Sequence, residues 1–343
     1  MSLFRIMLLL IVIITFSYIL YILANKRHMI KSEMEGFAIQ NTVLNPFRSD
    51  KQKMENELDG IKKTSNKGID HFSDAHSLKL REFCMLSSYN TAISGEYVNT
   101  EMIRHTLERG FRFIDFEIFA KDDIPYVGNG TKNHIMLVEI LDVITNSAFS
   151  QPCPNYKDPL FVHFRIQEGH RNDAIYKSIR TLLDNGNVKQ YLYDKEVTGD
   201  TLLSSLSGKI VAVLNSDGNT SPRIDIIQMT SNRNLQATDV IRSTDYYRLL
   251  EQKPQRPTIN ENDMTTNQHD EQLQMVIPES NVNPALKPLV CDYCIQISGN
   301  QLSVVDNNLD ICERVFNANK SAFVPLAIMI PYLESPAYAD LTT

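Results

Sequence analysis

Hydrophobic and polar positions divide the sequence into three stretches. Residues 6–24 carry no charged side chain, and as a helix rising about 1.5 Å per residue they reach roughly 28 Å, close to the hydrocarbon thickness of a bilayer. Residues 25–75 are polar with scattered apolar positions, too few to hold a fold of their own. Beyond them, short apolar runs alternate with amphipathic segments. We predict a transmembrane anchor over 4–24, a polar linker over 25–75 and a folded domain over 76–335.

The folded stretch has the pattern of alternating strands and helices. Its length of roughly 260 residues is typical of a single β/α barrel. The strands that we expect are 83–87, 112–119, 160–166, 209–214, 275–277, 293–297 and 323–330, and the helices are 99–109, 136–146 and 170–183. Residues 231–271 are poor in apolar side chains, which predicts a long insertion or a linker between two halves of the barrel.

The apolar N-terminal run has a cleaved signal peptide as its alternative interpretation. The apolar core of a signal peptide is usually about 7 to 15 residues long and precedes a site of small residues. The run here is longer and is followed by Asn25, Lys26 and Arg27, so we favour an uncleaved anchor. Positive charges that flank an anchor favour the cytoplasmic side, and they are more numerous after this run than before it. The C-terminal body is therefore expected on the cytoplasmic side.

Composition excludes some classes of protein. The chain has 343 residues, 43% of them hydrophobic and 22% charged, with a formal net charge of −7. An acidic chain of this kind has no basic surface that would follow nucleic acid, so we expect no nucleic-acid partner. The five cysteines are too scattered for a disulfide framework, and Cys291 and Cys294 form a lone CxxC for which packing is a better explanation than zinc.

Two carboxylates share one face of a predicted strand. In residues 111–119, FRFIDFEIF, side chains alternate so that Asp115 and Glu117 lie opposite the aliphatic positions. The aliphatic face of a barrel strand meets the outer helices, so the two acids point inward near the C-terminal end of the strand. Carboxylates about 7 Å apart in the interior need a cation. Calcium accepts such oxygens, and an internal Arg or Lys is the alternative.

The strand LFVHFR over residues 160–165 favours the second alternative. Alternation places His163 and Arg165 on one face, so we expect Arg165 to lie beside Asp115 and Glu117. A guanidinium can bridge carboxylates through paired hydrogen bonds. An internal ion-pair cluster would then replace a metal site. His163 is interpreted as a packed core histidine rather than as a catalyst.

The order of short motifs resembles that of a known enzyme family. The motif SSYNT at 87–91 is similar to the S-S-H-N-T that opens the X region of phosphoinositide-specific phospholipase C. Further motifs resemble the same family: ISGE at 93–96, RGFRFIDFE at 109–117, YVGN at 126–129, residues 159–165 and SGKI at 207–210. GNQ at 299–301, FNAN at 316–319 and FV at 323–324 resemble its Y region. The X-like part covers 78–215 and the Y-like part 273–330.

The resemblance implies an α/β fold, a TIM-like (β/α) barrel of the phospholipase C-like phosphodiesterase type, which cleaves a phosphoinositide with two histidines and calcium. One histidine removes the proton of the attacking hydroxyl, the other protonates the leaving oxygen, and the metal stabilises the developing charge. In this chain, Tyr89 and Val127 stand at the two histidine positions, and Arg165 replaces a glutamate ligand of the calcium. The remaining calcium-ligand positions are Asn90, Asp115 and Glu117.

The substitutions predict a protein without the family's chemistry. The phenol of Tyr89 titrates near 10, and Val127 cannot transfer a proton, so we expect a catalytically silent protein that binds a membrane lipid or a partner. We expect no cofactor, with calcium as the alternative. Contacts with a phosphoinositide or another phospholipid are expected from Ser88, Arg165 and Lys209. The alternative functions are a phosphoric diester hydrolase with rearranged residues, using His163 or His170, and a structural membrane component.

Overall fold

The computed structural model describes residues 47–62, 68–72, 77–128, 130–214, 241–267, 272–279 and 281–342. The chain divides into two compact units, Met1–Asn56 and Glu57–Thr343, and all of the described strands belong to the second. No helix in the described part of the chain is long and apolar enough to cross a membrane. The predicted anchor over 4–24 lies outside the described residues.

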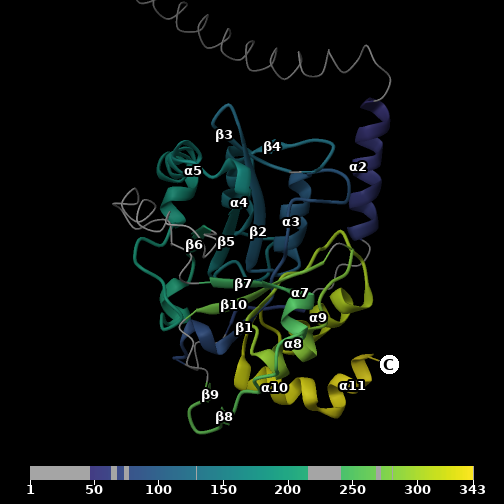
Figure 1. Ribbon diagram of the computed structural model, residues 1–343, viewed down its shortest axis with the longest axis vertical. Coiled ribbons are helices and arrows are strands. Elements are labelled where there is room, and N and C mark those ends of the chain that lie inside the picture. The colour runs from purple at the N-terminus through teal and green to yellow at the C-terminus, as the bar shows by residue number, and fades with distance from the viewer. Residues whose placement is uncertain are drawn as a thin grey trace, which may run out of the picture. The chain divides into compact units, whose positions relative to one another are not determined.

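Two five-stranded ladders form the centre of the larger unit (Figure 1). The first has the order β4-β3-β2-β5-β6 and contains β2 (Phe113–Lys121), β3 (Ile124–Val127), β4 (Ile135–Met136), β5 (Leu160–Ile166) and β6 (Ile210–Leu214). The strands β2, β5 and β6 are parallel, whereas β3 and β4 are joined to β2 as an antiparallel meander.

The second ladder has the order β12-β1-β11-β10-β7. It contains β1 (Phe83–Met85), β7 (Ile241–Asp245), β10 (Leu273–Ile277), β11 (Ile297–Ser298) and β12 (Phe323–Pro325). All of its pairs are parallel except that of β1 with β12. A parallel bridge between Ser87 and Phe113 joins the end of β1 to β2. The two ladders therefore form one continuous run of parallel strands, β7-β10-β11-β1-β2-β5-β6.

The structure establishes a mixed α/β fold, which agrees with the predicted class. Closure into a barrel would require a pair between β6 and β7, and no such pair occurs among the described residues. A small hairpin of β8 (Ile259–Asn260) and β9 (Thr265–Thr266) stands apart from both ladders.

Helices cover the outer side of the parallel run (Figure 1). They are α3 (Thr100–Glu108), α4 (Leu137–Ser147), α5 (Asp173–Asn185), α7 (Tyr246–Leu250), α8 (Leu286–Tyr293), α9 (Asn307–Ala318), α10 (Leu326–Glu334) and α11 (Pro336–Thr342). A further helix, α2 (Phe47–Lys62), spans the boundary between the two units. Four short 3₁₀ helices are η1 (Leu80–Glu82), η2 (Glu168–His170), η3 (Asn187–Tyr191) and η4 (Leu203–Leu206).

Alternation along the strands separates two apolar layers. Phe113 on β2 and Phe161 on β5 belong to an inner cluster with Met85, Met275 and Ile297. The intervening residues of the same strands pack outward against α3, α4 and α5, and they include Ile114, Phe116, Val162 and Phe164. Because successive side chains point to opposite faces, Asp115 and Glu117 share the inner face with Phe113. The predicted direction of these acids is confirmed.

Two of the predicted strands were wrong. Residues 323–330 were expected as one strand, but β12 ends at Pro325 and α10 follows, since an unbroken apolar run fits a buried helix as well as a strand. Residues 293–297 contain the last residue of α8, then the left-handed residue Cys294 with a φ of 55°, and reach only the first residue of β11, Ile297. The predicted insertion over 231–271 contains β7, which pairs with β10 in the central sheet despite its polar sequence.

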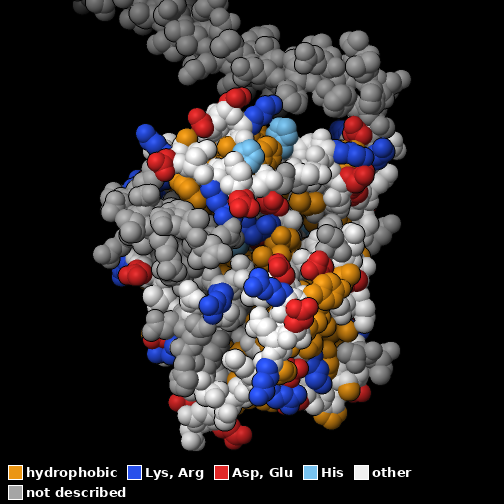
Figure 2. Space-filling model, in the orientation of Figure 1, with side chains coloured by type: hydrophobic (Ala, Val, Ile, Leu, Met, Phe, Trp, Pro, Cys, Tyr) orange, Lys and Arg blue, Asp and Glu red, His pale blue; other side chains and the backbone are white. Residues whose placement is uncertain are grey.

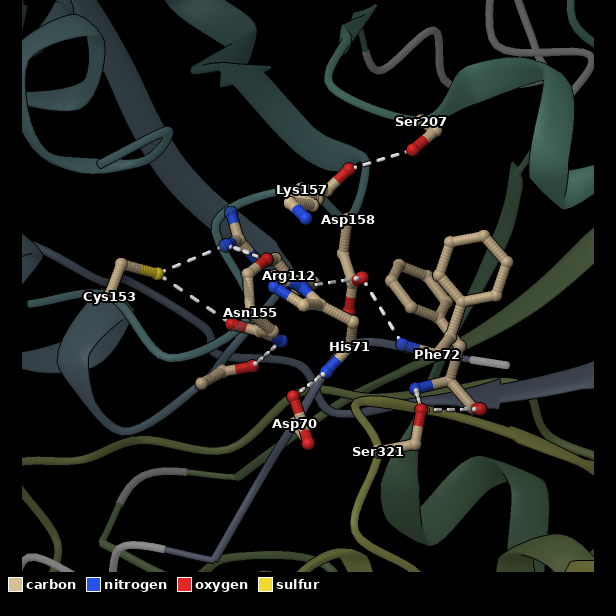
Figure 3. A network of polar contacts seen from close by, with 12 residues as sticks. Asp70, His71, Phe72, Arg112, Cys153, Asn155, Lys157, Asp158, Ser207 and Ser321 are labelled. Atoms are coloured by element: carbon tan, nitrogen blue, oxygen red, sulfur yellow. Dashed lines mark hydrogen bonds and ion pairs between the residues drawn. The ribbon is translucent and has the colours of Figure 1, made fainter. Parts of the chain in front are cut away.

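A buried arginine fixes the N-terminal end of β2 (Figure 3). Arg112 is fully buried and donates hydrogen bonds to the carbonyl of Ala148 at 3.0 Å, to Cys153 Sγ at 3.0 Å and to the carbonyl of Asn155. These acceptors are neutral, so burial lowers the pKa of Arg112, although Cys153 and Asp158 oppose the shift. The network attaches the loop before β5 to the start of β2.

The carboxyl group of Asp158 holds a short strap, residues 68–72, against this end of the sheet (Figure 3). Asp158 is 1% exposed; its Oδ1 accepts from Phe72 N at 3.2 Å and lies 3.5 Å from His71 Nδ1. Burial raises the pKa of Asp158 to about 7, against the opposing effect of Arg112. Below about pH 7 the neutral acid is therefore favoured in the folded state. Burial lowers the pKa of His71.

The substitution Asp158→Asn should remove a pH dependence of stability. A carboxyl group whose folded pKa is raised stabilises the fold at low pH, and this contribution is lost between about pH 4 and about pH 7. Relative to Asp158→Asn, the unmodified chain should lose on the order of 2 kcal/mol of unfolding free energy between pH 5 and pH 8. Urea unfolding of both chains in neutral detergent measures this difference. His71 is present in both chains, so its own titration does not distinguish them. An unchanged difference across this range would contradict the assignment.

Candidate functional site

The loop that follows β1 is attached to the inner face of β2 by hydroxyl groups. Ser88 Oγ and Thr91 Oγ1 are hydrogen-bonded at 2.6 Å. Thr91 Oγ1 accepts from the backbone N–H of Asp115 at 2.9 Å, and the Thr91 N–H donates to the Asp115 carbonyl at 2.8 Å. Ser88 is buried and also donates to the carbonyl of Phe113 at 3.3 Å. Ser88 therefore positions the loop, and its hydroxyl is already hydrogen-bonded on both sides.

Asn90 holds the tip of this loop in a left-handed conformation. Its φ is 49°, a region that asparagine tolerates better than most residues. The Asn90 N–H donates to Asp115 Oδ1 at 3.1 Å, and its Oδ1 accepts from Arg165 Nη2 at 2.5 Å. The side chain and the backbone of Asn90 thus contact both members of the ion pair that forms the site.

Asp115 is the centre of the site and is fully buried. The β2–β5 register pairs Asp115 with His163 and Glu117 with Arg165. Asp115 Oδ2 is 2.7 Å from His163 Nδ1, and Arg165 Nε donates to both carboxylate oxygens, at 2.9 and 3.1 Å. Burial alone would raise the pKa of Asp115, but the charge of Arg165 and the hydrogen bond of His163 lower it to about 2. Asp115 is therefore ionised and fully paired.

Arg165 is sandwiched between Asp115 and the ring of Tyr89. Its Cζ lies 4.2 Å from the ring centroid, and its Nη1 is 3.8 Å from Glu117 Oε2. Burial alone would lower the pKa of Arg165, but Asp115 raises it above the ordinary value. Burial raises the pKa of Tyr89 to about 12 in spite of Arg165. At neutral pH the site therefore holds a guanidinium and a neutral phenol.

These residues do not fit a calcium ion. The oxygens of Asp115 and Asn90 that would coordinate the ion already accept hydrogen bonds from Arg165, whose charge would repel a second cation. Across the described ranges, no group of three or more His, Cys, Asp or Glu side chains is arranged to hold a metal ion. The arginine supplies the positive charge that the two inward carboxylates need.

Two residues suggested by the sequence lie elsewhere. Val127 pairs with Ile118 on β2 and is buried in the outer apolar cluster, so its side chain is on the face opposite Asp115 and Glu117. Lys209 precedes β6, at the end of the sheet opposite Arg165, and its Nζ is 3.4 Å from the carbonyl of Gln190. The structure brings together Tyr89, Asn90, Asp115, Glu117, His163 and Arg165.

An aromatic cluster lies beyond Glu117 on the same face of β2. Phe119 contacts Tyr126, its partner on β3, and the rings of His134 and His170, at centroid distances of 5.8, 5.6 and 6.0 Å. Tyr126 and His134 are 5.0 Å apart. From this cluster the sequence pointed to His170 as a candidate and to Tyr126 only as part of the YVGN motif. Extending the alternation of Asp115 and Glu117 by two residues would have found Phe119.

Comparison with known proteins bears on the fold. No family model matches this sequence, and no curated protein matches it. Among solved structures, S. officinalis PLC21 is similar over 74% of this chain and 38% of its own, with a TM-score of 0.52 and 15% identity. L. pealei PLC21 is similar over 73% of this chain and 37% of its own, with a TM-score of 0.51 and 15% identity. This chain thus spans less than two fifths of either PLC21 chain.

This chain has the phospholipase C-like phosphodiesterase fold. A calcium-dependent phosphoinositol-specific phospholipase C from a Pseudomonas species also aligns, over 76% of this chain and 99% of its own, with a TM-score of 0.46 and 10% identity. At these identities the likeness concerns the fold alone. The fold does not determine the chemistry of the site, which depends on the residues that Arg165 contacts.

Removing the guanidinium should destabilise this phospholipase C-like chain strongly. In Arg165→Met, Asp115 stays buried without its main partner, and breaking a buried ion pair from one side costs about 3–5 kcal/mol. The unfolding free energy, measured with urea in neutral detergent, should fall by that amount. The double variant Arg165→Met/Asp115→Asn removes the unpaired charge and should recover part of the loss.

Arg104→Met is the matched control for this prediction. Arg104 pairs with Glu101 on the exposed surface of α3, and exposed pairs contribute about 0–1 kcal/mol. A loss in Arg165→Met no larger than that in Arg104→Met would contradict the role of the buried pair.

A second readout is acid unfolding. Because the pKa of Asp115 is lowered to about 2, its contribution is present above about pH 4 and disappears as the pH falls towards 2.

Proposed function

We propose that this chain is a membrane-anchored phospholipase C-like protein that binds a phospholipid headgroup without cleaving it. The observation that carries the proposal is the position of Arg165. Its Nε and Nη2 donate to Asp115 and Asn90, so a protein cation occupies the place where the resemblance would put a metal. The site thus offers a positive charge to an anionic ligand, and the oxygens that would hold a metal are already bound by the guanidinium.

The acid and base of a phosphodiester cleavage are also missing. Such a reaction needs one group to remove a proton from the attacking hydroxyl and another to protonate the leaving oxygen. Tyr89 has a pKa of about 12, and Val127 faces away from the site. His163 is 2% exposed and its Nδ1 is hydrogen-bonded to Asp115. A hydrolase with rearranged residues is therefore the weaker alternative.

The outer edge of Arg165 is the proposed contact with the headgroup. The Arg165 side chain is 11% exposed, and its Nη1 makes only a long contact of 3.8 Å with Glu117 Oε2. Guanidinium groups bind phosphate through paired N–H donors. We infer that a phosphate binds this edge and that Asp115 and Asn90 hold the arginine in place for it.

The unmodified chain should not hydrolyse phosphatidylinositol. Full-length protein is reconstituted in vesicles of phosphatidylcholine and phosphatidylinositol, and released inositol phosphate is measured with millimolar calcium or with a chelator. We expect no release above that of empty vesicles, because Tyr89 and Val127 cannot serve as base and acid and Arg165 binds the oxygens that would hold a metal. Release that depends on calcium would overturn the proposal.

Two controls make that result informative. An active phosphoinositide-specific phospholipase C added to the same vesicles verifies that the substrate is accessible. Binding of glycerophosphoinositol is measured in parallel by calorimetry, for the unmodified chain and for Arg165→Lys, which keeps the charge but loses the fork of N–H donors. Binding should be about tenfold weaker in the variant. Equal binding by both chains would contradict the role of Arg165.

The orientation at the membrane is a separate proposal, based on the uncharged run over 6–24 and the basic residues after it. In sealed vesicles with the cytoplasmic face outward, added protease should digest the C-terminal body, as followed with an antibody to its last residues. Protection of the body would place it on the other side, and loss of the chain on carbonate washing would argue against an anchor.

A further inference from the structure

A second polar cleft lies at the edge of the sheet where β7 ends the ladder. It has a volume of about 950 Å³ and runs between β7, α7 and the end of α8. Arg242 and Gln274 are register partners on neighbouring strands, and both line the cleft. Their neighbours Ile241, Leu273 and Met275 belong to the inner core. Arg242 and Gln274 therefore lie on the outer face of the sheet, whereas Asp245, which also lines the cleft, has the parity of the inner face and acts on Tyr89.

The side chains of the cleft are predominantly positive. Four cationic residues and one carboxylate are among its described lining residues: Arg242, Arg248, Lys253, Arg256 and Asp245. The whole chain has a formal net charge of −7, so this concentration of positive charge is a local feature. Figure 2 shows Lys and Arg side chains in the middle of the face that carries β7 and α7. A concave surface lined by one sign of charge focuses the field and attracts the opposite charge.

The segment that follows α7 is fixed against α8, which holds the cations in place. Tyr293 Oη donates to the carbonyl of Gln252 at 3.2 Å. The Gln255 N–H donates to the carbonyl of Asp292 at 2.7 Å, and Arg256 Nε donates to Asp292 Oδ1 at 3.0 Å. Because both ends of the segment are attached, Lys253 and Arg256 need little further ordering to bind a ligand.

Three of the cations have donors available for a ligand. Within the described parts of the chain, Arg248 and Lys253 have no acidic partner, and both are exposed. Arg256 is 68% exposed; its Nε contacts Asp292, and its Nη1 is 3.8 Å from Glu334, so much of the guanidinium faces solvent. Neutral donors from Gln252 and Asn267 also line the cleft.

We propose that this cleft binds a small anion with two or more phosphate groups, held by Arg248, Lys253 and Arg256. Arginine and lysine are the usual partners of phosphate in proteins. The volume is that of a small-molecule site and exceeds what one phosphate fills. The proposal does not depend on headgroup binding at Arg165, since none of these three residues belongs to that cluster.

Calorimetry with inorganic triphosphate tests the proposal. The full-length chain in neutral detergent should bind triphosphate saturably, and binding should weaken severalfold between 50 and 200 mM salt because the contacts are electrostatic. The variant Arg248→Gln/Lys253→Gln should bind at least about tenfold more weakly, since charge-assisted hydrogen bonds are lost. Absence of saturable binding by the unmodified chain would overturn the proposal.

Two variants distinguish binding at a defined site from attraction of the anion by net charge. Lys121→Gln/Lys189→Gln removes the same charge from exposed positions outside the cleft and should leave the affinity unchanged. Arg248→Lys/Lys253→Arg keeps the charge and should retain most of the binding. Equal losses in the Arg248/Lys253 and Lys121/Lys189 double glutamine variants would mean that net charge alone attracts the anion, which would refute the site.

The phosphates can come from a soluble molecule or from a lipid headgroup. The titration is therefore repeated with the chain in nanodiscs of phosphatidylcholine, with and without phosphatidylinositol 4,5-bisphosphate. A lipid source predicts that the bisphosphate lipid competes and lowers the affinity for triphosphate. A soluble source predicts equal affinity in both discs. Either result supports a phosphate site in the cleft, provided that the Arg248 and Lys253 substitutions weaken binding in the same discs.

Discussion

The buried ion pair between Arg165 and Asp115 is the interaction on which the candidate site depends. A carboxylate in this position is costly to bury without a partner, and the parallel register of β2 and β5 places a guanidinium within 2.9 Å of it. The same arginine binds Asn90, and Asp115 also accepts from the Asn90 N–H. The ion pair therefore fixes the loop after β1 as well as the two strands, so that loss of either charge would release both.

A second buried arginine, Arg112, directly precedes β2 at the N-terminal end of the parallel strands and is stabilised in a different way. Arg112 has carbonyl and thiol acceptors, whereas Arg165 has a carboxylate. The carboxyl group of Asp158 acts on Arg112 but is itself driven towards its neutral form by burial. It accepts a hydrogen bond from the backbone of Phe72 in the strap over residues 68–72. The parallel strands are thus tied at both ends by guanidinium groups, but only the C-terminal end holds a full opposite charge.

Strand alternation was sufficient to predict the central part of the site, because side-chain direction in β2 and β5 follows a strict period of two. It brought Asp115, Glu117 and Arg165 together correctly. It could not place the side chain of Val127. The direction of that side chain depends on the register of the β2–β3 hairpin, and the turn before β3 sets this register, not the local pattern of apolar residues. It also missed β7, since a polar edge strand lacks the apolar pattern by which strands are found.

Tyr89 shows how the substitutions at this site depend on one another. The phenol of Tyr89 would be a weak base in a calcium-dependent site. Here its ring stacks on the guanidinium of Arg165, and such a contact is favourable when the two groups are partly shielded from water. Burial keeps the phenol neutral, so the ring does not compete with Asp115 for the positive charge. Two sides of the arginine are thereby occupied, by the carboxylate and by the ring. A phosphate bound as proposed would replace the contact with Glu117, which is the longest that Arg165 makes in the cluster, and would leave the Arg165–Asp115 pair intact.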